Sequence, residues 1–72
     1  MNLHSLKQRL ADVLKDSGLS QLEFSEKHGL SYSWVNKFLN DVADNPRFNT
    51  LSELEAAIDK ERHALELRAV LQ

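Results

Sequence analysis

The segment SQLEFSEKHGLSYSWVNKFLN, residues 20–40, decides the fold of this chain because it contains the boundaries of two short helices. Ser20 is a favourable N-cap, and Glu23, three residues later, completes a capping-box pattern with it. Gly29 stands where the first helix must end, since glycine accepts the left-handed backbone conformation of a sharp turn. Ser31 is then a second N-cap. The segment therefore predicts two helices joined by a tight turn.

These two helices, over residues 20–28 and 31–40, carry apolar residues at helical spacing, which predicts a miniature core between them. We expect this core to contain Leu22, Phe24, Ser25, Leu30, Val35 and Phe38. The small side chain of Ser25 lets the two helices approach closely where they cross.

The second helix keeps a polar face outside this core, made of Tyr32, Ser33, Asn36, Lys37 and Asn40. Nearly all of these side chains can form hydrogen bonds. A short helix with one apolar face and one donor-rich face suits a DNA groove. The alternative is the solvated face of an ordinary helical hairpin.

Trp34 and Tyr32 call for separate predictions. Trp34 lies four residues before Phe38 and four after Leu30, so we expect it to pack at the edge of the core. Stacking on a base or contact with phosphate is the alternative for Trp34. Tyr32 follows the N-cap at the tip that would enter a groove first, and we expect it to make contact there.

Length and composition limit the fold. A chain of 72 residues forms one domain, residues 1–72, near the lower size limit for folding without covalent or metal crosslinks. It has no cysteine, which excludes a disulfide framework and fits a reducing cytoplasm. No apolar run is long enough to span a bilayer or to resemble a signal peptide. Two glycines and one proline favour helices with short connections, so we predict an all-α fold.

The charge balance argues against strong binding to random DNA. Nine Lys and Arg residues against eleven Asp and Glu residues give a net charge of −2, whereas non-specific DNA affinity comes mostly from cations along the phosphate backbone. Three cations, Lys27, Lys37 and Arg47, fall in or beside the two-helix segment. The acidic residues of the C-terminal third, which can point away from that segment, are Glu53, Glu55, Asp59, Glu61 and Glu66.

An amphipathic helix precedes this segment. Ser5 and Gln8 form a capping-box pattern that predicts a helix over residues 5–16, and Gly18 ends it. Its predicted apolar stripe consists of Leu3, Leu6, Leu10, Val13 and Leu14.

A loop over residues 41–49 follows the segment, with a turn predicted at Asn45-Pro46. We expect Phe48 to anchor the loop, and Asn45 and Arg47 to stay at the surface. There they can contact phosphates, which would fix the register of a complex without recognising sequence. The alternative is a simple connecting loop.

The last part of the chain is predicted to be helical from Thr50, which forms a capping-box pattern with Glu53. It has a buried stripe of Leu51, Leu54, Ala57 and Ile58. Either one helix continues to the end, or the chain bends near residues 59–62 into a fifth helix. The apolar residues beyond the bend, Ala64, Leu65, Leu67, Val70 and Leu71, exceed what a small monomer readily covers. We expect residues 59–72 to form a homodimer contact; the alternative is a last helix that closes its own core.

Nothing in the sequence indicates catalysis or a cofactor. His4, His28 and His63 lie far apart and have no carboxylate or cysteine at ligand spacing, so we expect no metal site. No nucleophile, acid/base pair, phosphate-binding glycine loop or small-molecule site is indicated. We therefore expect a protein that is not an enzyme.

Residues 20–58 resemble the helix-turn-helix domains of the Cro/C1-type repressors (XRE family) of phages and bacteria. The matching pattern is Gln21, Ser25, Gly29, Leu30, Val35 and Phe38, followed by a loop and the capped helix from Thr50. The resemblance implies a lambda-repressor-like bundle of four to five short helices, with the helix-turn-helix at residues 20–40. This sequence departs from the pattern at Trp34, where a small or polar residue is usual, and in its longer loop.

The resemblance also implies roles for individual residues. Gln21 matches the glutamine that contacts phosphate and supports a base-contacting side chain. Tyr32 and Ser33 match positions that meet base edges, and Lys37 matches another such position one turn later, with Asn36 beside it. The positions matching the region that binds phosphates after the recognition helix are Asn40, Asn45 and Arg47.

Together these observations predict a sequence-specific DNA-binding transcriptional regulator, a Cro/C1-like repressor of the bacterial cytoplasm or of a phage-infected host. We expect a homodimer on an inverted repeat of double-stranded DNA, with half-sites about 34 Å apart. The alternative is a protein-interaction adaptor, antirepressor-like or antitoxin-like, that keeps the fold but binds a protein partner through its C-terminal helix.

Overall fold

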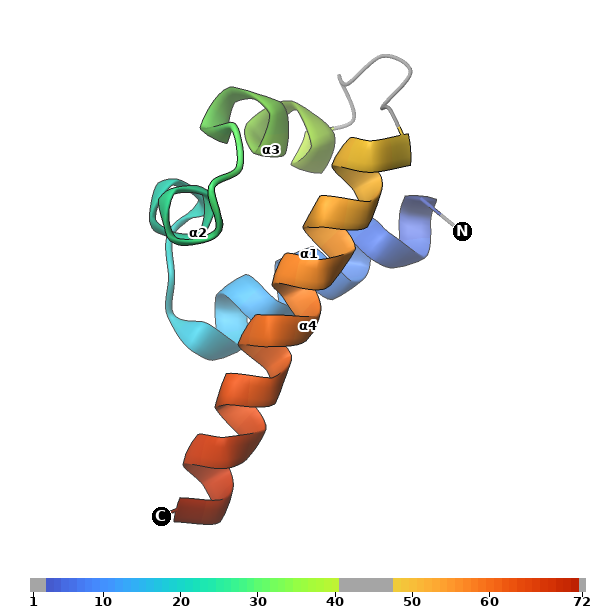
Figure 1. Ribbon diagram of the computed structural model, residues 1–72. Coiled ribbons are helices and arrows are strands. Elements are labelled where there is room, and N and C mark those ends of the chain that lie inside the picture. Colours follow the sequence, from blue (N-terminus) through green and yellow to red (C-terminus); the bar gives the residue numbers. More distant parts are fainter. Residues whose placement is uncertain (1–2, 41–47, 72) are drawn as a thin grey trace.

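Four helices and their connections make up residues 3–40 and 48–71, which are the residues that the computed structural model describes (Figure 1). The helices are α1 (Leu3–Ser17), α2 (Gln21–His28), α3 (Tyr32–Leu39) and α4 (Phe48–Leu71). There is no strand in this part of the chain. The predicted all-α class is thereby confirmed for these residues.

The helices pack as two pairs, α1 against α4 and α2 against α3, and α3 also touches α1 (Figure 1). The domain measures 41 × 23 × 18 Å along its principal axes. Its long dimension follows α4, whose last turns project beyond the other three helices (Figure 1). Helix α3 lies at the opposite end of the molecule from the C-terminus of α4.

All four helices contribute to one core. Its buried apolar side chains are Leu6, Leu10, Val13, Phe24, Val35, Phe38, Leu51, Leu54, Ala57 and Ile58. The predicted stripes of α1 and α4 are therefore confirmed in their central turns. Two predicted core residues are wrong, because Leu3 and Leu22 are 44% and 48% exposed. Leu22 lies about 200° around α2 from the buried Phe24, which turns it outward, and Leu3 is the first residue of α1.

The predicted boundaries of α2 and α3 are confirmed in detail. The Ser20 hydroxyl accepts a hydrogen bond from the Glu23 amide at 3.0 Å, and the Glu23 carboxylate accepts one from the Ser20 amide at 3.1 Å. Gly29 ends α2 at φ +67°, and the Leu30 amide donates back to the Ser25 carbonyl at 2.8 Å, which is a Schellman closure. The Ser31 hydroxyl then accepts from the Trp34 amide at 3.3 Å and starts α3.

The predicted starts of α1 and α4 are wrong by two residues each. Helix α1 begins at Leu3 and α4 at Phe48, so Ser5 and Thr50 lie inside helices and are not N-caps. A Ser or Thr followed three residues later by Gln or Glu is compatible with a helix interior as well as with a start, because the preceding residues can also adopt helical geometry.

Helix α4 is a single helix of 24 residues, without the bend considered at residues 59–62. That charged segment crosses the neighbouring helices and pairs with them: Arg9 of α1 binds Asp59 at 2.6 Å, and Arg62 binds Asp16 at 2.9 Å. Arg9 also approaches Glu55 at 3.5 Å. Glu55 and Asp59 therefore pair with α1, whereas Glu61 binds Lys27 and His28 of α2, so the expectation that it can point away from residues 20–40 is wrong. No helix among the described residues combines the length and apolar character needed to cross a membrane.

Candidate nucleic-acid interface

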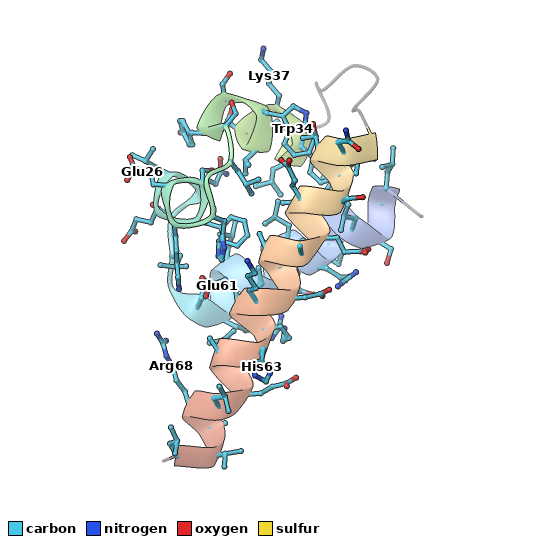
Figure 2. The ribbon with its side chains drawn as sticks, in the orientation of Figure 1. Glu26, Trp34, Lys37, Glu61, His63 and Arg68 are labelled. Carbon is cyan, nitrogen blue, oxygen red and sulfur yellow. The ribbon has the colours of Figure 1, made fainter. Side chains whose placement is uncertain are left out.

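The outer face of α3 gathers most of the side chains that the sequence nominates for DNA contact. Val35 and Phe38 point into the core, which leaves the opposite face of the helix to solvent. Tyr32, at the tip of the helix, is 45% exposed. Ser33, Lys37 and Asn40 are also exposed, and Asn36 is half-buried. Figure 2 shows Lys37 extending away from the bundle.

A chain of hydrogen bonds fixes the amide side chains of this face. The Asn36 amide nitrogen donates to the Gln21 side-chain oxygen at 2.9 Å. The Asn40 side chain donates to the Asn36 carbonyl at 2.9 Å and lies 3.3 Å from its amide oxygen. Gln21 is the first residue of α2, so the bond to Asn36 ties the start of one helix to the exposed face of the next. The Asn36 amide oxygen, which accepts from Asn40, and its second N–H each keep capacity for one more hydrogen bond.

The buried Ser25 explains how the two helices come this close. It is fully buried, and its hydroxyl donates to the Gln21 carbonyl at 2.7 Å. The hydroxyl is therefore satisfied within α2 itself, one turn back, and the small side chain leaves room for α3. The prediction of a small residue at this crossing is confirmed.

Trp34 belongs to the edge of the core. Its ring stacks on that of Phe38, with centroids 5.1 Å apart and planes 9° from parallel. It is half-buried and also lines a shallow pocket with Leu30, Ser31 and Thr50, between the turn and α4. The predicted packing of Trp34 is confirmed, and Trp34 lies off the outer face of α3.

The electrostatics of the face differ from what the sequence suggests. Lys27, expected to supply charge beside α3, turns instead to α4, where its ammonium binds the Glu61 carboxylate at 2.6 Å. Among the described residues, Lys37 is then the one cation on α3, and α3 carries no acidic side chain. Asn45 and Arg47, the remaining predicted contacts, lie outside the described residues.

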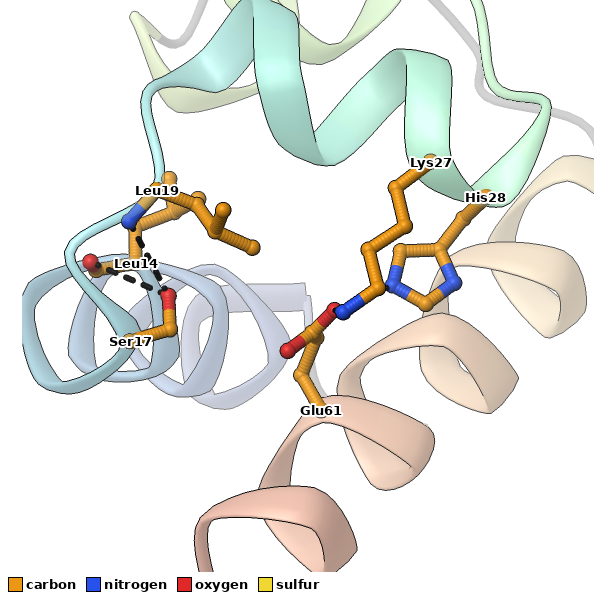
Figure 3. Close-up of polar contacts among 6 residues, drawn as sticks. All are labelled: Leu14, Ser17, Leu19, Lys27, His28 and Glu61. Atoms are coloured by element: carbon orange, nitrogen blue, oxygen red, sulfur yellow. Dashed lines mark hydrogen bonds and ion pairs between the residues drawn. The ribbon is translucent and has the colours of Figure 1, made fainter.

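Sequence reasoning missed a buried polar cluster on the other side of α2 (Figure 3). Glu61 is only 4% exposed, and one carboxylate oxygen accepts from both Lys27 and the His28 ring, at 2.6 and 2.9 Å. The His28 ring also packs on Phe24, with centroids 4.8 Å apart. The cluster therefore joins the C-terminal end of α2 to the middle of α4.

The carboxyl group of Glu61 titrates below its ordinary value because of these partners. Burial raises the pKa of Glu61, but the hydrogen bonds and charges of Lys27 and His28 together outweigh burial and lower it. A clue was present in the sequence: Glu61 stands three residues after Ile58 and four after Ala57, on the buried stripe of α4. An acidic residue in that register needs a cationic partner.

Within the described residues, no group of three or more His, Cys, Asp or Glu side chains could hold a metal ion. Comparison with protein-family models, curated proteins and solved structures finds no match to this chain.

Proposed function

We propose that this chain is a sequence-specific DNA-binding regulator, not an enzyme, that places α3 in the major groove. The observation that carries the proposal is the Asn36–Gln21 hydrogen bond, 2.9 Å long, on a face where polar side chains are exposed. This hydrogen bond fixes the side-chain amide of Asn36 on α3 through Gln21, the first residue of α2. The four helices, with a glycine turn between α2 and α3, suit the lambda-repressor-like bundle implied by the resemblance to Cro/C1-type repressors, which act in the bacterial cytoplasm or in phage-infected cells.

The chemistry of each side chain suggests a task in the groove. Asparagine can pair with the N6 and N7 edge of adenine, and lysine with the O6 and N7 acceptors of guanine. After bonding Gln21 and accepting from Asn40, Asn36 keeps one N–H and the second lone pair of its amide oxygen for such a pair, and Lys37 extends beside it. Tyr32 and Ser33 lie one turn earlier and would meet the neighbouring base pairs.

Gln21 and Asn40 would position the helix. The Gln21 amide nitrogen makes no hydrogen bond within the described residues, so it is available to a phosphate oxygen while its own oxygen holds Asn36. Phosphate contacts of this kind set register and orientation. The single cation on α3 implies few counterions released per copy, and hence weak affinity for random DNA.

Selection of duplexes from a random pool tests the proposal, followed by titrations of the enriched duplex at two salt concentrations. We expect Asn36→Ala to weaken specific binding by about 1–3 kcal/mol and to relax the preference at one base pair. Lys37→Ala should weaken binding to the enriched duplex more than to other duplexes, and should relax the preference at a neighbouring base pair.

Lys60→Ala is the matched control for Lys37→Ala, because it removes the same charge from an exposed position on α4. Circular dichroism of each variant checks that the helices remain. Equal losses in the two lysine variants, or no duplex enriched from the pool, would refute recognition through α3.

One observation favours the second candidate, a protein-interaction adaptor. Leu67, Val70 and Leu71 are exposed on α4, while α3 has only one cation. If the pool yields no duplex, an antirepressor-like or antitoxin-like role through α4 becomes the better proposal.

A further inference from the structure

The last turns of α4 carry an apolar stripe that the other helices do not cover. Leu67, Val70 and Leu71 are 49%, 82% and 84% exposed. Their spacing of three and four residues places them on one side of the helix. Leu65, which packs against the core, lies about 200° away from Leu67 around the axis. The stripe therefore faces away from the bundle that contains it.

Two opposite charges flank this stripe. Glu66 and Arg68 are both exposed, and each lies about 100° from Leu67, on opposite sides of it. Neither has an ion-pair partner among the described residues. Figure 2 shows Arg68 on the projecting part of α4.

We propose that a second copy of this chain covers the stripe, in a parallel pairing of the two α4 C-terminal ends about a two-fold axis. In a parallel pair, the Glu66 side of each helix faces the Arg68 side of its partner. Glu66 of one copy then meets Arg68 of the second copy, twice over. An antiparallel pair brings the same sides together, so Glu66 would face Glu66 and Arg68 would face Arg68. The charges therefore favour the parallel arrangement.

The position of α3 favours the same arrangement, a step that rests on the proposed function. Helix α3 lies at the end of the molecule away from Leu71 (Figure 1). A parallel pair places both α3 helices at the same end, where one duplex can reach them. An antiparallel pair would place them at opposite ends.

The stripe is small, and this sets the strength of the pair. Three side chains cover much less than the roughly 800 Å² per partner of a standard interface. The free chain should therefore be in a weak monomer–dimer equilibrium. A duplex with two half-sites holds two copies close together and raises their effective concentration, so the pair should appear as cooperative binding.

Disulfide capture tests which side of α4 makes the contact, because the chain has no cysteine of its own. Leu71→Cys places a single thiol on the stripe, and a parallel pair brings it within bonding range of its copy. Ala69→Cys is the control, exposed but about 200° away from Leu71. Under mild oxidation we expect several-fold more dimer from Leu71→Cys than from Ala69→Cys. Equal yields would overturn the proposal.

Charge reversal tests the flanks by sedimentation equilibrium. Glu66→Arg and Arg68→Glu should each weaken self-association several-fold, and the double variant should restore it. If the double variant stays as weak as the single ones, the parallel pair is wrong.

Leu67→Glu separates this proposal from the function on which it rests. We expect unchanged affinity for a duplex with one half-site, and at least tenfold weaker binding to a duplex with two. If the wild-type chain does not bind a duplex with one half-site, DNA recognition is refuted. The disulfide experiment would still test the pairing of α4, because it does not involve DNA. Self-pairing would be overturned if the wild-type chain stays monomeric at millimolar concentration and binds two half-sites without cooperativity. The stripe would then be expected to bind a different protein.

Discussion

Replacing Glu61 by glutamine should destabilise the domain although the shape of the side chain is kept. The carboxylate is 4% exposed and accepts hydrogen bonds from Lys27 at 2.6 Å and from His28 at 2.9 Å. Glutamine can still accept one of these bonds, but without the charge. The contact between α2 and α4 would then lose its electrostatic part.

The expected loss in the free energy of unfolding depends on how far each partner of Glu61 is buried. Hydrogen bonds to charged groups contribute about 1.5–3 kcal/mol, and part of this loss is offset because glutamine costs less to bury than a carboxylate. Lys27 is half-exposed, with a side-chain exposure of 51%, so its ammonium can turn to water. We therefore expect Glu61→Gln to lower the free energy of unfolding by about 1–2 kcal/mol at pH 7.

The pH dependence of this loss has a definite sign. The folded-state pKa of Glu61 is lowered from its ordinary value of 4.5, since Lys27 and His28 together outweigh the effect of burial. A group with a lowered pKa stabilises the fold above its unfolded-state pKa, and this stabilisation disappears as the pH falls through the folded-state pKa. The difference between wild type and Glu61→Gln should thus be complete at pH 7 and shrink below about pH 4.5.

Urea unfolding followed by circular dichroism at pH 7 and at pH 3 measures the effect. Glu26→Gln is the control, because it removes one negative charge from an exposed position on α2 and should change stability little. A Glu61→Gln variant as stable as wild type at pH 7, or a difference that does not shrink in acid, would refute the account of the cluster.

Substitutions at two further positions test the local structure around α2. Ser20→Ala removes the hydroxyl that accepts from the Glu23 amide, and should cost about 1 kcal/mol in the free energy of unfolding measured in urea. Gly29→Ala should cost about 1–2 kcal/mol, because the residue has φ +67° and a Cβ there meets nothing within 4 Å, so the whole penalty is backbone strain. Gly29→Asn should cost less than Gly29→Ala, since asparagine tolerates the left-handed region better; equal losses would argue against strain as the cause.

The structure of residues 20–40 was predictable because short-range interactions determine it. The capping box at Ser20, the left-handed Gly29 and the cap at Ser31 involve residues no more than five positions apart, and each pattern has one well-defined geometry. The stacking of Trp34 on Phe38 follows from the same spacing of four. Patterns that fit a helix interior equally well, as at Thr50, gave the wrong starting residue.

The Glu61 cluster was not predictable in the same way, because it joins residues 33 and 34 positions apart. Sequence placed Lys27 among the cations beside the candidate interface and Glu61 among acidic residues that can point away from it, whereas the two side chains bind each other. This pair was missed because the opposite charges lie on helices whose mutual packing no local pattern specifies. Only the register of Glu61 on the buried stripe of α4 indicated that it needed a partner.

The ion pair between Lys27 and Glu61 makes a second copy of the chain important for the proposed function. With Lys27 bound to Glu61, α3 contributes one described cation to a chain of net charge −2. Phosphate neutralisation supplies most of the sequence-independent affinity for DNA, so a single copy should bind any duplex weakly. Two copies joined through α4 would add their contacts on adjacent half-sites, and the specific affinity would then depend on self-pairing. The stripe at Leu67 and the face at Asn36 are thus expected to act together, although they lie at opposite ends of the domain.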